Sequence, residues 1–189
     1  MNLLTSHISI PKPGERANGD AVLVRRDALG NSLLAVIDGL GHGPGAAEAS
    51  RAAVDHLQEA QLSSPLEQLM RSLHGALKGT RGAVGTVCVI DGQRLQACAV
   101  GNVQLMCANC SVPLVLSAGV LGHSVAKFRI GECMVRVGAR LALISDGVST
   151  RFRLEELRGL APEEACKTIM DRHRRHDDDA TVLIADLTS

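Results

Sequence analysis

The sequence predicts an α+β fold in which two antiparallel β-sheets are sandwiched between helices. Apolar runs of strand length occur near residue 20, through the middle of the chain and at its end, and short turns join many neighbouring runs. A pair of amphipathic helices lies between these groups of strands, which argues against the alternating β-α-β units of a parallel sheet. We therefore expect one domain over residues 1–189, arranged as a four-layer α-β-β-α sandwich with helices on both outer faces.

The first half of the chain is predicted to form a β-hairpin followed by two helices. The first run with a clear period covers residues 20–25, and a turn containing Gly30 leads to a second strand at 32–38. After the glycine-rich stretch 39–45 the apolar residues switch to helical spacing as far as Ala60, and Pro44 suits a first helical turn. A second helix is expected over about 65–78, where five apolar residues share one face. Each helix has a single apolar face, so each should cover a sheet.

The second half is predicted to be an antiparallel meander, then a helix and a last strand. The expected strands are 85–90, 95–100, 103–107, 112–116, 128–130, 133–137 and 140–145. A helix over about 162–174 has acidic residues in its first turn and basic residues in its last, which complements the helix dipole. The strongly apolar run 180–187 closes the chain as a strand.

Composition excludes several classes of function. The chain has 20 basic and 20 acidic residues, no Trp or Tyr, and only Phe128 and Phe152 as aromatic residues. Single-stranded nucleic-acid binding normally stacks bases on aromatic rings, and tracking of a phosphate backbone needs net positive charge. We therefore expect no nucleic-acid partner.

Membrane and secretion signals are absent from the sequence, and the cysteines fit a reduced environment. No apolar run approaches the length of a membrane span, and the first residues lack the charged start and apolar core of a signal peptide. We predict no membrane partner and a cytoplasmic location. Most of the six cysteines lie in apolar runs. Cys107 and Cys110 have the C-x-x-C spacing of zinc and redox sites, but no second pair completes a zinc site, so we interpret them as ordinary strand or loop residues.

Acidic residues stand beside the ends of several predicted core strands. Asp20 begins one strand, Asp38 and Asp146 each follow an apolar strand and precede a glycine, and Asp177–Asp179 precede the last strand. Each alone is explained by a turn or a cap. Buried carboxylates are costly to desolvate unless they are paired or bind a cation. Together they offer hard oxygen ligands from rigid elements, which suits Mg²⁺ or Mn²⁺ and not zinc.

Five short motifs in order resemble those of the PPM family, the type 2C metal-dependent Ser/Thr phosphatases. The motifs are Asn18-Gly19-Asp20, Val36-Ile37-Asp38-Gly39-Leu40-Gly41-His42-Gly43, Gly85-Thr86, Ala142-Leu143-Ile144-Ser145-Asp146-Gly147-Val148 and Asp178-Asp179-Ala180-Thr181-Val182-Leu183-Ile184. The D-G-x-G-H-G form and the D-D-x-T ending are most similar to the compact bacterial branch, the sporulation-type and RsbX-type phosphatases. The resemblance covers about residues 18–187, nearly the whole chain.

This resemblance implies a fold, a metal centre and a reaction. Two antiparallel sheets would pack face to face, with two divalent cations, Mn²⁺ or Mg²⁺, at one end. Asp38 would bridge the ions, the Gly39 carbonyl would bind one of them, and Asp20, Asp146 and Asp178 would complete the ligand shells. Ions about 4 Å apart activate a water for in-line attack on phosphorus. The implied activity is that of a phosphoprotein phosphatase acting on phosphoserine or phosphothreonine.

The resemblance also suggests further site residues and a partner. His42 stands two positions beyond the histidine of larger members, so it is either a general acid or a loop residue shaping the glycine turn. Arg16, four residues before Asp20, either binds the substrate phosphate or is simply solvated. For a chain of RsbX-like size, the resemblance implies that the substrates are phosphorylated STAS-domain proteins of a stressosome-type complex.

Two alternative functions are open at this level. Residues 41–46 match G-x-G-x-x-A between a strand and a helix, which is typical of dinucleotide binding. No second parallel strand with an acidic end follows, which disfavours this reading. The second alternative is a catalytically inactive, phosphatase-like binding module. The complete set of acidic residues favours activity instead.

Overall fold

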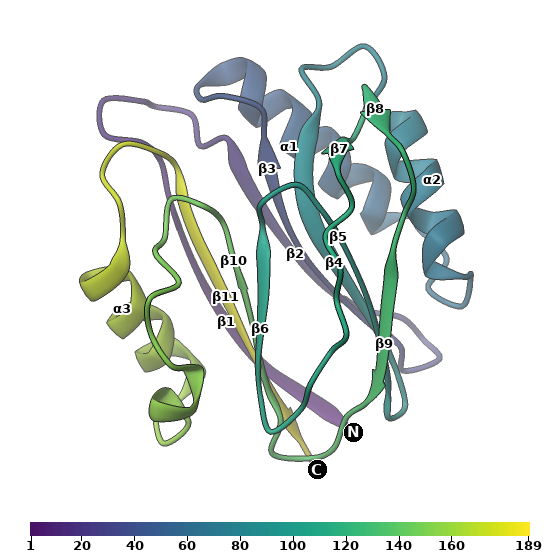
Figure 1. Ribbon diagram of the computed structural model, residues 1–189, viewed down its shortest axis with the longest axis vertical. Coiled ribbons are helices and arrows are strands. Elements are labelled where there is room, and N and C mark those ends of the chain that lie inside the picture. The colour runs from purple at the N-terminus through teal and green to yellow at the C-terminus, as the bar shows by residue number, and fades with distance from the viewer.

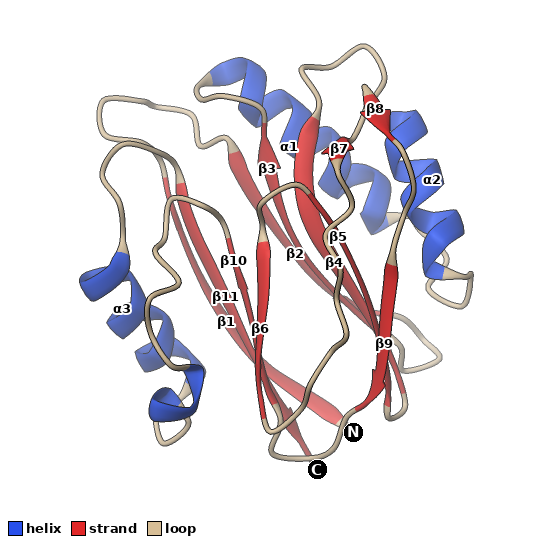
Figure 2. Cartoon of the chain, in the orientation of Figure 1, coloured by secondary structure: helices blue, strands red, loops and turns tan.

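The computed structural model describes residues 1–189 and contains two antiparallel sheets that face each other (Figures 1 and 2). The four-stranded sheet has the order β1 (Asn2–Ile10), β11 (Ala180–Thr188), β10 (Arg140–Ile144) and β6 (Gln104–Ala108). The five-stranded sheet has the order β2 (Asp20–Arg26), β3 (Ser32–Gly39), β4 (Ala83–Asp91), β5 (Arg94–Val100) and β9 (Ile130–Met134). Every neighbouring pair in the two sheets is antiparallel.

Helices cover the outer face of each sheet, which confirms the predicted α+β fold of two antiparallel sheets (Figure 1). The helices α1 (Pro44–Gln58) and α2 (Leu66–Ala76) lie on the five-stranded sheet, and α3 (Pro162–His173) lies on the four-stranded sheet. A ribbon of β7 (Gly119–Val120) and β8 (Ser124–Val125) and a 3₁₀-helix (Leu154–Leu157) complete the regular structure. None of the helices combines the length and the apolar character that a membrane crossing requires.

Three layers of apolar side chains separate the four structural layers. Strand β3 shows how the sequence produces them, because Leu33, Ala35 and Ile37 pack under α1 and α2, while Leu34 and Val36 pack between the sheets. Successive side chains of a strand point to opposite faces, and both faces of β3 are covered. This double burial explains why its sequence is continuously apolar instead of alternating.

Several predicted strand boundaries are wrong, and the long strand β1 and the two-residue strands β7 and β8 are not predicted. Strand β1 was not expected, since its sequence is rich in polar residues and it gains its partner, β11, from the other end of the chain. The expected strand at 112–116 is an irregular crossover between the sheets, in which Val112 and Leu114 contact the core without pairing. The expected strands at 128–130 and 133–137 are replaced by the single strand β9.

The topology also excludes the dinucleotide-binding alternative. Strand β3 precedes the glycine-rich loop 41–46, but it pairs antiparallel with both β2 and β4. A dinucleotide fold needs that strand in a parallel sheet, with a second parallel strand after the helix. The glycines of this loop therefore serve another purpose, and Gly41 and Gly43 have the positive φ angles, 82° and 75°, that a tight turn requires.

Candidate metal centre

The sheet topology places the predicted acidic residues at one end of the sandwich. Strand β2 begins at Asp20, directly opposite Asp38 near the end of β3. Strand β10 ends two residues before Asp146, and its neighbour β11 begins two residues after Asp178. In antiparallel pairs the end of one strand lies beside the start of the next. All four carboxylates thus lie at the upper end in Figure 1, away from the two termini.

The carboxylate of Asp38 lies at the centre of this negative charge. Burial raises the pKa of Asp38, and the charges of Asp20, Asp146, Asp178 and Asp179 add to this rise in that order, to a total of about 8. Desolvation and like-charge repulsion both favour the protonated form of a carboxyl group. Without a cation, the environment at this end of the sandwich therefore favours the protonated form of Asp38.

Asp20 is buried and only half satisfied by hydrogen bonds. Its Oδ2 accepts a hydrogen bond of 2.7 Å from the Ser145 hydroxyl, whereas its Oδ1 is buried and has no partner. Burial raises the pKa of Asp20 to about 6, although the hydrogen bonds from Ser145 and Thr181 oppose the shift. A buried polar atom without a partner is uncommon and costly. Its free lone pairs are what a divalent cation at this position would use.

The three consecutive aspartates before β11 have different environments. Asp179 is buried, and its two oxygens accept hydrogen bonds from the backbone N–H groups of Lys12 (2.9 Å) and Gly19 (3.0 Å). Asp178 is half-buried and Asp177 is exposed. Asp179 therefore fixes the loop before Asp20, a role that the sequence did not reveal. Asp178 lies near enough to act on Asp38, and its carboxylate accepts fewer hydrogen bonds than that of Asp179.

The glycines beside the aspartates are required by close packing and not by turn geometry. A Cβ on Gly39 would lie 2.0 Å from the carbonyl oxygen of Ala46, and one on Gly147 would lie 1.9 Å from that of Asp179. Neither glycine has a positive φ. The Asp-Gly pairs thus allow helix α1 and the segment before β11 to approach the strand ends, which brings the elements of the site together.

Asp146 accepts a hydrogen bond from a residue that the sequence did not single out. The Asn102 side-chain amide donates a hydrogen bond of 2.6 Å to Asp146 Oδ2. Burial and Asp178 raise the pKa of Asp146, while the charge of Arg175 and this hydrogen bond lower it. Asn102 lies in the turn between β5 and β6. The sequence indicates the position of Asn102 only indirectly, because an antiparallel meander returns this turn to the same end of the sandwich.

His42 and Arg16 lie in exposed loops at this end. His42 Nδ1 is 2.7 Å from Glu15 Oε1, and the His42 carbonyl accepts a hydrogen bond from Arg81. Arg16 is exposed and makes no side-chain hydrogen bond or salt bridge. Neither placement tests the role that the sequence predicts for the residue.

The donor set suits a hard divalent cation, although the side chains are not closed around one point. No group of three or more His, Cys, Asp or Glu side chains already has the geometry to hold a metal ion. Four neighbouring carboxylates, none of which forms a salt bridge, repel one another, and a cation would offset this repulsion. The unpartnered oxygen of Asp20 and the purely oxygen donors fit Mg²⁺ or Mn²⁺.

Comparisons with known proteins agree with this arrangement. The family model of stage II sporulation protein E (SpoIIE) matches residues 29–188. Phosphoserine phosphatase RsbX of Bacillus subtilis (strain 168) is 28% identical over 184 residues, covering 94% of this chain and 91% of RsbX. A solved structure comes from work on the bacterial stressosome, which is described there as a modular system adapted to control secondary messenger signaling. That structure is 31% identical to this chain with a TM-score of 0.90, and the match covers 98% of this chain and all of that one. RsbX in complex with magnesium has a TM-score of 0.86 at 24% identity, covering 98% of this chain and 96% of that one.

The SpoIIE family match and the relationship to RsbX, each extending over most of the chain, identify a phosphatase of the PPM type. More narrowly, the chain belongs to the stage II sporulation protein E family, whose model matches most of its residues. The expected similarity to the RsbX-type branch is confirmed by the relationship to RsbX itself.

Proposed function

We propose that this chain is a metal-dependent phosphatase that hydrolyses phosphoserine or phosphothreonine in a partner protein, with two Mn²⁺ or Mg²⁺ ions. The observation that carries the proposal is the buried, unpartnered Oδ1 of Asp20 among carboxylates that raise one another's pKa. Similar folds described in complex with magnesium and with two manganese ions support the cation type. The RsbX relative, named a phosphoserine phosphatase, supports the substrate class.

The proposed ligands are Asp20, Asp38, Asp146, Asp178 and the Gly39 carbonyl. When bound, the two ions supply an activated water and screen the charge that develops on the phosphoryl group, so no side-chain nucleophile is needed.

The other residues of the centre hold these ligands in place. Ser145 holds Asp20 through Oδ2, which leaves Oδ1 directed away from that bond. Asn102 holds Asp146, and Asp179 fixes the backbone before Asp20. Supporting hydrogen bonds of this kind orient metal ligands.

The mechanism is tested by Mn²⁺-dependent hydrolysis of p-nitrophenyl phosphate. We expect Asp38→Asn and Asp146→Asn to lower the rate at least about 100-fold, because each removes a ligand charge. A chelator should abolish wild-type activity, and added Mn²⁺ should restore it. Asp177→Asn is the matched control, since Asp177 is an exposed neighbour of the proposed ligand Asp178, and it should retain wild-type activity. Unchanged rates in both ligand variants would contradict the metal centre.

The proposed physiological substrates are phosphorylated STAS-domain proteins of a stressosome-type complex in the cytoplasm. The similarity to RsbX and to a structure from work on the bacterial stressosome supports this assignment. We further propose that Arg16 contacts the substrate phosphate and that His42 donates a proton, since both lie in exposed loops at the carboxylate end. The test compares rates on a phosphorylated STAS protein and a generic phosphopeptide. Equal rates on the two would contradict the substrate assignment while leaving the metal chemistry intact.

A further inference from the structure

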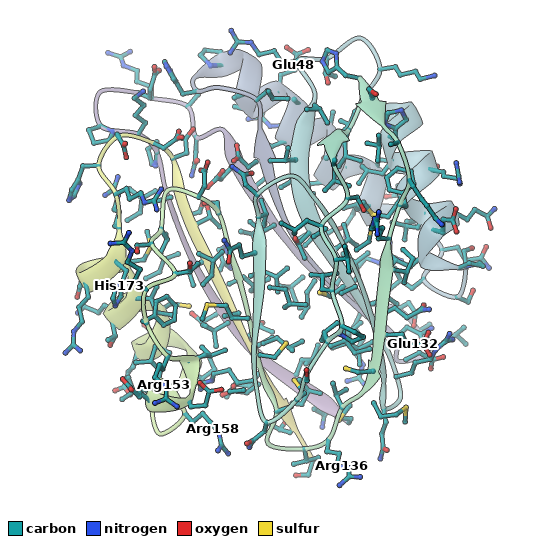
Figure 3. All side chains as sticks on the ribbon, in the orientation of Figure 1. Glu48, Glu132, Arg136, Arg153, Arg158 and His173 are labelled. Carbon is teal, nitrogen blue, oxygen red and sulfur yellow. The ribbon has the colours of Figure 1, made fainter.

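Four of the six cysteines gather between the two sheets, away from the carboxylates. Cys107 on β6, Cys133 on β9, Cys88 on β4 and Cys110 just after β6 all pack against the apolar layer between the sheets. Strands β6 and β9 are edge strands, and sulfur atoms are visible between them in the lower half of Figure 3. Cys107 lies opposite Leu141, near the start of β10, whereas Asp146 lies beyond the end of that strand. The cysteines are therefore separate from the proposed metal centre.

Cys107 and Cys110 are brought into contact by a sharp bend of the backbone. Asn109, between them, has a φ of 60° and is the only residue other than glycine with a positive φ. Its side chain donates a hydrogen bond of 3.1 Å to the Gly138 carbonyl, which fixes the bend. The two sulfur atoms pack against the same apolar layer, close enough for each thiol to shift the pKa of the other. Both residues are only half-buried, so small solutes have access to them.

We propose that Cys107 and Cys110 form a reversible thiol–disulfide modification site that responds to peroxides, with Cys110 as the attacking thiol. The Cys110 thiolate attacks one oxygen of hydrogen peroxide, which forms a sulfenic acid and releases hydroxide. The Cys107 thiol then attacks the Cys110 sulfur, so that an S–S bond forms, the S–O bond breaks and water leaves. Two thiols are oxidised and one peroxide is reduced to two waters.

The interaction between the two thiols makes their acidities unequal. The neighbouring Cys107 thiol lowers the pKa of Cys110, whereas the Cys110 sulfur and burial raise the pKa of Cys107. The thiolate is the reactive form of cysteine, and a neighbouring donor stabilises it. A structural zinc site is not supported here, since no group of three or more cysteines has metal-binding geometry.

Thiol titration after mild peroxide treatment tests the proposal. In the reduced full-length protein, unfolded after treatment, we expect the number of thiols to fall from six to four. Peptide mapping should find a Cys107–Cys110 disulfide, and dithiothreitol should restore all the thiols. Cys110→Ser should retain its remaining thiols, whereas Cys133→Ser, which removes another cysteine of the same apolar layer, should still lose two.

The outcomes separate this site from its alternatives and from the phosphatase. Retention of all six thiols, or a disulfide that joins Cys110 to Cys133, would overturn the proposal. Reduced Cys110→Ser should hydrolyse p-nitrophenyl phosphate at the wild-type rate, which shows that the variant is folded. The thiol result therefore does not depend on whether the proposed phosphatase mechanism is correct.

Discussion

Buried charge is paired at one end of strands β10 and β11 and unpaired at the other. At the lower end Arg140 lies opposite Asp186, with Nε–Oδ1 and Nη2–Oδ2 distances of 2.6 Å each, and its guanidinium also donates to the carbonyls of Leu157 and Leu160. At the upper end the carboxylates around Asp38 have no comparable positive partner, and an oxygen of Asp20 has none at all.

This difference separates a structural charge from a functional one. A buried ion pair with every donor satisfied fixes the position of the segment that it caps. A group of buried like charges lowers stability and persists where it serves a ligand. The same two strands therefore anchor the fold at one end and carry the proposed metal centre at the other.

The largest effect is expected at the paired end. Arg140→Met should lower the free energy of unfolding by about 3 kcal/mol, because it leaves Asp186 without its buried partner. The measurement is urea unfolding of metal-free protein at neutral pH. The matched control is Arg94→Met, which removes an equally bidentate but exposed pair with Glu132 (labelled in Figure 3) and should cost no more than about 1 kcal/mol. Equal losses in the two variants would show that burial does not distinguish these pairs.

The central strands could be predicted from the sequence because both of their faces are buried, so that they consist of consecutive apolar residues. Strands β3, β4 and β10 are apolar on both faces, and short turns account for the antiparallel pairs β2–β3 and β4–β5. Strand β1 escaped prediction because its pairing with β11 depends on a contact across almost the entire chain. The segment 112–116 has the same apolar content as a strand, but it crosses between the sheets and finds no ladder to join.

The candidate site divides in the same way. Asp20, Asp38 and Asp146 were predictable because they stand at strand ends, and antiparallel pairing brings such ends together. Asn102 and Asp179 were not, because their roles consist of hydrogen bonds formed only when distant loops meet. Sequence pattern therefore locates the charged residues of the site, whereas the groups that orient them emerge from tertiary structure.

The unpaired end should make the metal-free protein less stable as pH rises. The pKa of Asp38 is about 8 in the folded protein and near 3.8 when unperturbed, so between these values the folded state binds a proton that the unfolded state has released. Stability is then greatest near pH 4 and falls toward pH 8, by about 2 kcal/mol after allowance for partial solvent exposure. Asp20, with a pKa of about 6, adds to the fall between pH 4 and 6.

Urea unfolding in the presence of a chelator, from pH 5 to pH 8, measures this slope. Comparison with Asp38→Asn removes the contribution of the histidines, which both proteins share. We expect the variant to be more stable than wild type at pH 8, and its slope to be shallower. Excess Mn²⁺ should stabilise wild type at pH 8 far more than the variant, because ligand binding favours the folded state. Identical slopes in the two proteins would show that Asp38 is not the titrating group.

The smallest effect is expected from Asn102, which supports the site through a neutral hydrogen bond. Asn102→Ala should raise the Mn²⁺ concentration for half-maximal phosphatase activity by about 3- to 10-fold, with little change in the rate at saturating Mn²⁺, because it frees Asp146 to move without removing a ligand. Gln104→Ala is the control, since Gln104 is exposed two residues further along and makes no side-chain hydrogen bond. An unchanged metal requirement would place Asn102 outside the site. A shifted requirement with unchanged unfolding would show that the carboxylate end, unlike the Arg140 end, uses its hydrogen bonds to orient ligands and not to hold the fold together.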